Sequence, residues 1–204
     1  MKLVYKGIFK SEDQLPIGNL PENAIKFDEA GSMDELGKAV IKPSIFTGLF
    51  VGLLFVLVSL FVHGKAPVEL IGVLFGNSAR WGFGLWILSL FVHEILHAIC
   101  FGKDDEVELY ISLAFWFVIC VQPITKARFI FLSLLPNIVL GWIPLLLWVV
   151  LPYSEAYSSA LFAFGALSTL AGAGDYLNAY NAIRQMPKGS MQQLSGMNSY
   201  WFMP

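Results

Sequence analysis

Long runs without charge are the feature that most constrains how this 204-residue chain can fold. Residues 43–64 contain no Asp, Glu, Lys or Arg, and Ser44–Val62 is almost wholly apolar. Three further runs contain one acid each or none: Trp81–Phe101, Phe129–Ser154 and Ala156–Ala182. Since a helix of about 20 apolar residues crosses the hydrocarbon core of a bilayer, the pattern predicts four transmembrane helices.

The composition excludes the other broad classes of protein. The chain is 56% apolar and 14% charged, with a mean hydropathy of +0.65, whereas soluble domains are about 45–50% apolar and about 25% charged. Such a composition also argues against disorder, and a net charge of −2 without a basic stripe argues against nucleic-acid binding. Cys100 and Cys120 lie within apolar runs, so no disulfide framework is indicated. We therefore expect a multi-pass protein of the cell membrane, surrounded by lipid.

One uncharged stretch, Leu109–Thr125, does not resemble a spanning helix. It is rich in β-branched and aromatic residues, which favours an extended or re-entrant segment; a fifth short helix is the alternative. The predicted fold is an all-α polytopic membrane protein with about four transmembrane helices and a short β-like or re-entrant segment between the second and third. The predicted parts are a polar N-terminal segment (1–42), a transmembrane domain (43–184) and a polar tail (185–204).

The Lys and Arg residues near the helix ends predict the orientation. With four spans, the N-terminus, the loop 102–128 and the tail share one side of the membrane. That side carries Lys38, Lys42, Lys103, Lys126, Arg128, Arg184 and Lys188. The other side carries only Lys65 and Arg80. By the positive-inside rule both termini are expected in the cytoplasm.

The second predicted span contains an HExxH motif, His93-Glu94-Ile95-Leu96-His97. An ionisable residue inside a spanning helix costs at least about 2.5–3.5 kcal/mol, so it indicates a function. Residues i and i+4 of a helix share a face, so His93 and His97 can bind one ion while Glu94 lies beside it. Two His, a third protein ligand and an open position for water are typical of catalytic zinc, and a neighbouring carboxylate can act as general base.

Depth in the membrane selects Asp175 as the third ligand. His93 lies ten residues before Lys103, and Asp175 lies nine before Arg184, so both are about 13–15 Å inside the same face. Cys100, at i+7 from His93, is the competing ligand; a protonated Asp175 that only hydrogen-bonds to another helix is the structural alternative. Asn178, one turn beyond Asp175, could support the site or hydrogen-bond across helices.

These residues resemble a known family. HEILH on one apolar helix and Gly174-Asp175 on a later one are similar to the bacterial zincin peptidase membrane proteins, a family defined as a domain of unknown function. More distantly they resemble the site-2 protease family, and Leu135-Pro136-Asn137 is similar to that family's Gly-Pro-x-x-Asn region, without its Gly. The resemblance implies zinc on His93, His97 and Asp175, Glu94 as base, and a hairpin over 107–122 that binds substrate as an added strand.

The expected function is therefore that of an intramembrane zinc metalloendopeptidase, which cleaves a membrane-spanning protein or peptide near the cytoplasmic face. A non-catalytic zinc-binding scaffold is the alternative, although a structural site needs no base and usually has four protein ligands. An ion-coupled transporter is a weaker alternative, because the sequence shows none of the repeats common in transporters.

Overall fold

The computed structural model describes residues 1–112 and 116–204, with Met33 described by its backbone alone. These residues group into two compact units. The first unit contains Met1–Ala39, Phe91–Leu135 and Asp175–Pro204, and the second contains Val40–Leu90 and Pro136–Gly174. Each unit thus joins stretches that are far apart in the sequence.

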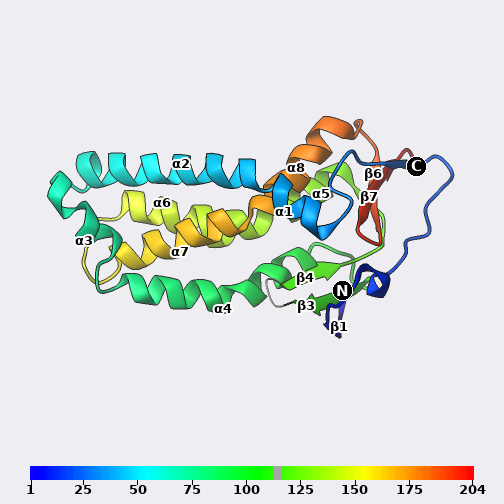
Figure 1. Ribbon diagram of the computed structural model, residues 1–204, viewed down its shortest axis with the longest axis horizontal. Helices are drawn as coiled ribbons and strands as arrows, with labels where there is room; N and C mark the ends of the chain where they lie inside the picture. Colours follow the sequence, from blue (N-terminus) through cyan, green and yellow to red (C-terminus); the bar gives the residue numbers. More distant parts are fainter. Residues whose placement is uncertain (113–115) are drawn as a thin grey trace. The chain divides into compact units, whose positions relative to one another are not determined.

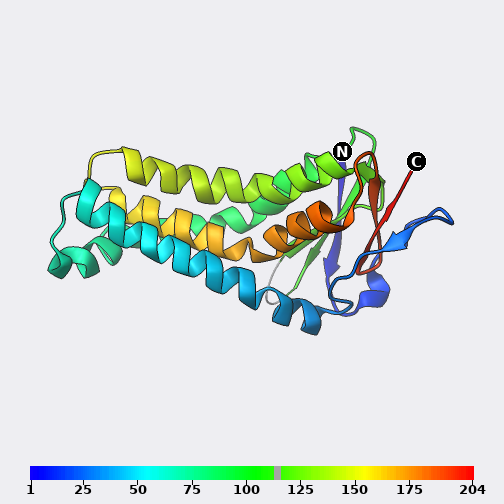
Figure 2. The ribbon, with the colours of Figure 1, turned by 90° about the horizontal axis from the view of Figure 1, so that it is seen from above.

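The second unit is built from apolar helices. They are α2 (Ile41–Leu57) with a π-helical extension (Val58–Val62), a 3-10 turn (Pro67–Glu69) leading into α3 (Leu70–Leu74), the first half of α4 (Ala79–Ala98), a π-helical segment (Asn137–Trp142) continuing into α6 (Ile143–Val150), and α7 (Ser158–Ala171). Helix α7 packs against both α2 and α6, as Figures 1 and 2 show. It also contacts α3 and the π-helical segment, and its many small residues allow these elements to approach closely.

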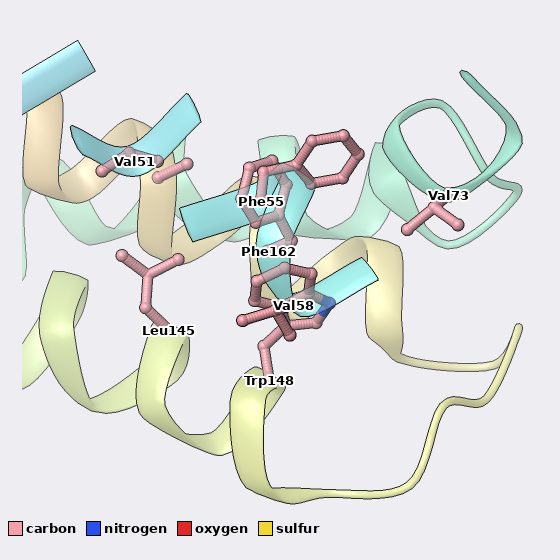
Figure 3. Packing of buried hydrophobic residues seen from close by; sticks show 8 residues of the cluster. Val51, Phe55, Val58, Val73, Leu145, Trp148 and Phe162 are labelled. Atoms are coloured by element: carbon pink, nitrogen blue, oxygen red, sulfur yellow. The ribbon is translucent and has the colours of Figure 1, made fainter. Parts of the chain in front are cut away.

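Aromatic and branched side chains form the core of this unit (Figure 3). The rings of Phe55, Trp148 and Phe162 form one group, with centroid distances of 4.7 Å from Phe55 to Phe162, 6.0 Å from Phe55 to Trp148 and 4.9 Å from Trp148 to Phe162. The Ser159 hydroxyl donates to the carbonyl of Val73 at 2.6 Å, which ties α3 to α7. The opposite face of α2 exposes large apolar side chains, as a helix in contact with lipid does.

A buried asparagine and a glycine meet where α7 ends. Asn137 is 1% exposed, and a Cβ added at Gly172 would overlap its side-chain amide. A Cβ at Gly141 would likewise overlap the Thr169 hydroxyl. Only glycine therefore allows the π-helical segment and α7 to approach this closely.

Two sheets belong to the first unit. In one, the order is β1-β3-β4: β1 (Lys2–Ile8) runs parallel to β3 (Glu106–Ile111), and β4 (Trp116–Ile119) runs antiparallel to β3. A bulge interrupts β1 between Tyr5 and Gly7, and the φ of Gly7 is +94°, a value that favours glycine. In the part of the chain that is described, β3 is the only strand paired with β4, so β4 is an edge strand.

The other sheet has the order β2-β7-β6-β5 and is antiparallel throughout. Its strands are β2 (Ile25–Lys26), β5 (Ile124–Thr125), β6 (Met191–Ser195) and β7 (Asn198–Phe202). The remaining helices of the first unit are a 3-10 turn (Glu12–Gln14), α1 (Met33–Ala39), the second half of α4, α5 (Lys126–Pro136) and nearly all of α8 (Ala173–Gln185). Figure 1 shows β6 and β7 as a hairpin beside the C-terminus.

The chain is mostly helical, but the prediction of an all-α fold was incomplete, because the described residues include seven strands in two sheets. The polar ends of the chain supply four of these strands. Their partners lie far away, as in the pairing of Lys2 with Glu106, and local periodicity does not reveal such pairing. The extended interpretation of Leu109–Thr125 is confirmed for its described residues, and the alternative of a fifth helix is wrong there; residues 113–115 lie outside the described part.

The described helices include three that are long and apolar enough to cross a membrane. They are Asp34–Val62, Ala79–Ala98 and Lys126–Val150. The fourth predicted span corresponds to two helices, Ser158–Ala171 and Ala173–Gln185, with a bend of 50° between them. The two helices would make a fourth span only if together they form one broken transmembrane helix. The predicted part boundaries at 42/43 and 184/185 and the orientation of the termini remain predictions.

Candidate metal centre

Helix α4 presents the two motif histidines on one face. His93 and His97 are one turn apart, with ring centroids 4.9 Å apart and an interplanar angle of 77°. Their Nε2 atoms approach to 3.2 Å. The helical spacing of the motif therefore directs one nitrogen from each ring toward a common point.

Asp175 reaches the same point from the first turn of α8. Its Oδ2 lies 3.2 Å from His93 Nε2, and its Oδ1 lies 3.3 Å from His97 Nε2. One ligand atom from each of the three side chains lies within 4.8 Å of the others. The position also suits a carboxylate, because the N-terminal end of a helix carries partial positive charge.

A backbone carbonyl fixes the tautomer of His97. Its Nδ1 lies 2.9 Å from the carbonyl oxygen of Leu132 in α5. Since a carbonyl oxygen only accepts, Nδ1 must carry the hydrogen, and Nε2 of the neutral ring then presents its lone pair toward Asp175. Metal-binding histidines commonly donate their second N–H in this way.

The donor set fits a zinc ion. Two imidazole nitrogens and a carboxylate are among the ligands zinc prefers, and three protein ligands leave a fourth position for water or substrate. The three Lewis bases also approach one another to 3.2–3.3 Å, which is favourable only with a shared proton or a cation among them. His93, His97 and Asp175 are therefore the residues of this chain that could hold the ion.

Glu94 lies beside this group and contacts the edge strand. It is 8% exposed, and its charge interacts with His97, His93 and Asp175. The backbone N–H of Val118 in β4 donates to its carboxylate. A buried carboxylate needs such a donor to offset the loss of water, so α4 and β4 together hold Glu94 next to the candidate metal ligands.

The structure thus brings together His93, Glu94, His97 and Asp175, while their roles as ligands and base remain predictions. Cys100, the competing ligand, instead donates its thiol to the carbonyl of Leu96 at 3.4 Å and is not part of the group. Asn178 lies half-buried, three residues beyond Asp175 on α8, and its supporting role also stays a prediction.

Two contributors to the site were missed by sequence reasoning. The Leu132 carbonyl and the Val118 N–H are backbone groups, so no residue type signals them. Two acids of β3, Glu106 and Glu108, lie outside the group and pair with Lys2 and Lys6. His63 packs edge-on against Trp148 in the second unit, at a centroid distance of 5.3 Å.

Comparison with known proteins agrees with this geometry. A family model described as "Putative zincin peptidase" matches residues 86–191, just over half of the chain. The matched region contains His93, Glu94, His97 and Asp175, and the family description points to a zinc metallopeptidase. Neither curated proteins nor solved structures gave a match to the chain. The chain belongs to the zincin peptidase family described by that model.

Proposed function

We propose that this protein is an intramembrane zinc metallopeptidase that hydrolyses a peptide bond of a membrane-embedded substrate near the cytoplasmic face. The observation that carries the proposal is the meeting of His93, His97 and Asp175 from two helices, with a buried carboxylate beside them. A site that served structure alone would need no such base and would usually have four protein ligands.

The roles of the residues follow from their atoms. His93 Nε2, His97 Nε2 and the Asp175 carboxylate would hold zinc. When bound, zinc supplies Lewis acidity, which polarises a scissile carbonyl and makes a water molecule more acidic. The Glu94 carboxylate would accept a proton from the attacking water and deliver it to the leaving amine. The hydrogen bond from His97 Nδ1 to Leu132 keeps the imidazole oriented throughout.

The edge of β4 is the proposed place for the substrate. In the described residues β4 pairs on one side only, and its Val118 N–H lies at Glu94. An extended segment that added to this edge would run past Glu94, and main-chain hydrogen bonds would bind it with little dependence on its sequence. Peptide bonds within a helix are shielded by their own hydrogen bonds, so the substrate must unwind locally before cleavage.

The proposed setting is the cell membrane, with both termini in the cytoplasm. Three apolar helices, or four with the bent pair, are long enough to span, and Lys and Arg are concentrated on the predicted cytoplasmic side. The resemblance of the motif residues to those of site-2 proteases also favours a site within the membrane. A substrate would then enter from the bilayer, while water would come from the cytoplasm.

Two measurements test the proposal. The purified protein should contain about one zinc ion per chain, and a His93→Ala/His97→Ala variant should contain none. In cells that encode the protein, wild type and Glu94→Gln should be compared by sequencing new N-termini in the membrane fraction. Cleavage within spanning segments should occur with wild type only. Equal cleavage in both strains would refute the enzyme and favour the zinc-binding scaffold.

A further inference from the structure

The first fifteen residues lie outside the family match at 86–191, yet they contact both strands of the hairpin that reaches Glu94. We propose that residues 1–15 are a positioning clamp, which holds the β3–β4 hairpin so that β4 stays at the catalytic carboxylate. The inference rests on the proposed function, since it assigns these residues to the same site. It gives the N-terminal residues that contact the hairpin a positioning role rather than a catalytic one.

Backbone pairing is the first element of the clamp. Strand β1 pairs with β3 in parallel register from Lys2, opposite Glu106, to Ile8, opposite Ile111. Beyond the ladder, the N–H of Lys2 donates to the Asp105 carbonyl at 2.7 Å, and the N–H of Phe9 donates to the Ile111 carbonyl at 2.8 Å. Without β1, the sheet would be reduced to the two strands β3 and β4, and a two-stranded sheet depends on packing against other elements for its stability.

Aromatic packing covers one face of the hairpin. The ring of Phe9 meets Tyr110 of β3 and Phe117 of β4 edge to face, at centroid distances of 6.3 and 5.2 Å. Leu15 is buried in the same cluster, beside Tyr110 and Ile119. The Tyr110 hydroxyl lies 2.8 Å from the Gln14 carbonyl and 2.6 Å from the Glu108 carboxylate, and its single hydrogen can be donated to either acceptor. Residues 9–15 therefore contact both strands of the hairpin. Their contacts with β4 are made to Phe117 and Ile119.

The other face of the hairpin also receives N-terminal residues. Met1 and Leu3 pack against a buried cluster of Ala98, Val107 and Cys120, which Val118 also joins. Ala98 directly follows His97, and Val118 donates to Glu94. Met1 and Leu3 thus pack against the same apolar cluster as residues that adjoin the candidate metal ligands and the base.

Ion pairs at the surface support the register. Lys6 Nζ lies 2.8 Å from Glu108, and Lys2 Nζ lies 3.2 Å from Glu106. The pKa of Lys6 is raised, chiefly because its ammonium donates to the Glu108 carboxylate. A shift of β1 by one residue would break both pairs and turn its apolar side chains to the other face.

Phe9→Ala in the full-length protein is the deciding variant. With zinc removed, backbone amides of 116–119 should exchange with deuterium about tenfold faster than in wild type, because β4 opens locally. The zinc content after reloading should stay at about one. The kcat for a labelled single-span peptide should fall at least about fivefold, since Glu94 loses its fixed donor. Phe9→Leu, which keeps an apolar side chain there, should restore most of both losses.

The matched control is Tyr5→Ala, which removes an aromatic ring from the same strand at a position 60% exposed. It should leave exchange and turnover unchanged. If Phe9→Ala does not fold, the clamp is tested instead with Lys6→Glu and with the double variant Lys6→Glu/Glu108→Lys. Lys6→Glu should speed exchange of 116–119 about two- to fivefold, and the double variant should reverse it.

The clamp would be refuted if the amides of 116–119 exchanged at the wild-type rate in Phe9→Ala. It would also be refuted if they exchanged faster while kcat stayed unchanged. Failure of the peptidase proposal would give a different result from failure of the clamp. In that case wild type itself would cleave nothing, while the exchange measurement, which needs neither zinc nor turnover, would still show whether the clamp exists.

Discussion

Replacing Gly172 by alanine should destabilise the protein strongly. The added Cβ would lie 2.5 Å from Nδ2 of Asn137 and closer still to the rest of its amide, where no carbon can lie without movement. Asn137 is 1% exposed, so its side chain cannot swing into solvent. Overpacking costs about 1–3 kcal/mol, and displacing a buried polar group costs a further 1–3 kcal/mol or so. The free energy of unfolding should therefore fall by about 2–6 kcal/mol.

Thermal unfolding in detergent measures this loss. At about 2–4 °C per kcal/mol for a chain of this size, the Tm should fall by roughly 4 °C at the least and by more than about 10 °C at the upper end. Gly174→Ala is the matched control, because a Cβ there meets nothing within 4 Å. It should stabilise α8 by up to about 1 kcal/mol, as alanine does in a helix.

A double-variant cycle identifies the cause. Asn137→Ala removes the amide that the new methyl group would strike, so Gly172→Ala should cost far less in that background than in wild type. An unchanged Tm in Gly172→Ala would refute the reasoning. So would strict additivity of the two substitutions, since it would mean that Asn137 and Gly172 do not compete for the same space.

Three further predictions concern the site and the first unit. Asp175→Asn should reduce bound zinc well below one per chain, measured by elemental analysis, while Asn178→Ala should not; full zinc in Asp175→Asn would remove Asp175 from the ligands. Glu94→Gln should keep its zinc but lose about 10²–10⁴-fold in turnover, and a smaller loss would argue against a general base. Burial raises the pKa of Glu29, so its ionised form is less favourable in the folded state than in the unfolded one. Glu29→Gln should therefore raise the Tm above that of wild type at about pH 8, and the gap should close as the pH falls through the carboxyl pKa; a gap independent of pH would contradict this sign.

The helices could be predicted from the sequence because apolar runs of about 20 residues leave few alternatives in a bilayer. The ends of the spans were less accurate, and the bend at Gly172 was not foreseen. The residues of Ala156–Ala182 did not predict the 50° bend. The close neighbour of Gly172 there is Asn137, which lies 35 positions earlier in the sequence.

The sheets were the main failure of sequence reasoning. The extended nature of Leu109–Thr125 was visible in its β-branched and aromatic residues, but the N-terminal and C-terminal strands were assigned to polar segments. Strand β1 reads as a mixture of Lys and apolar residues, and its partner β3 is about a hundred residues away. Such pairing is decided by shared contacts such as Phe9 with Phe117, which local propensity does not encode.

The sequence by itself predicted helices long and apolar enough to span a membrane and the residues that meet in the candidate site. Scarce charge indicated the helices, helical spacing placed His93 and His97 on a common face, and equal depth pointed to Asp175. Only the tertiary structure decided how that site is held. Three long-range contacts made by backbone atoms hold it: the Leu132 carbonyl that orients His97, the Val118 N–H at Glu94, and the pairing of β1 with β3. Every residue carries those atoms, so only the folded chain shows which of them reach the site.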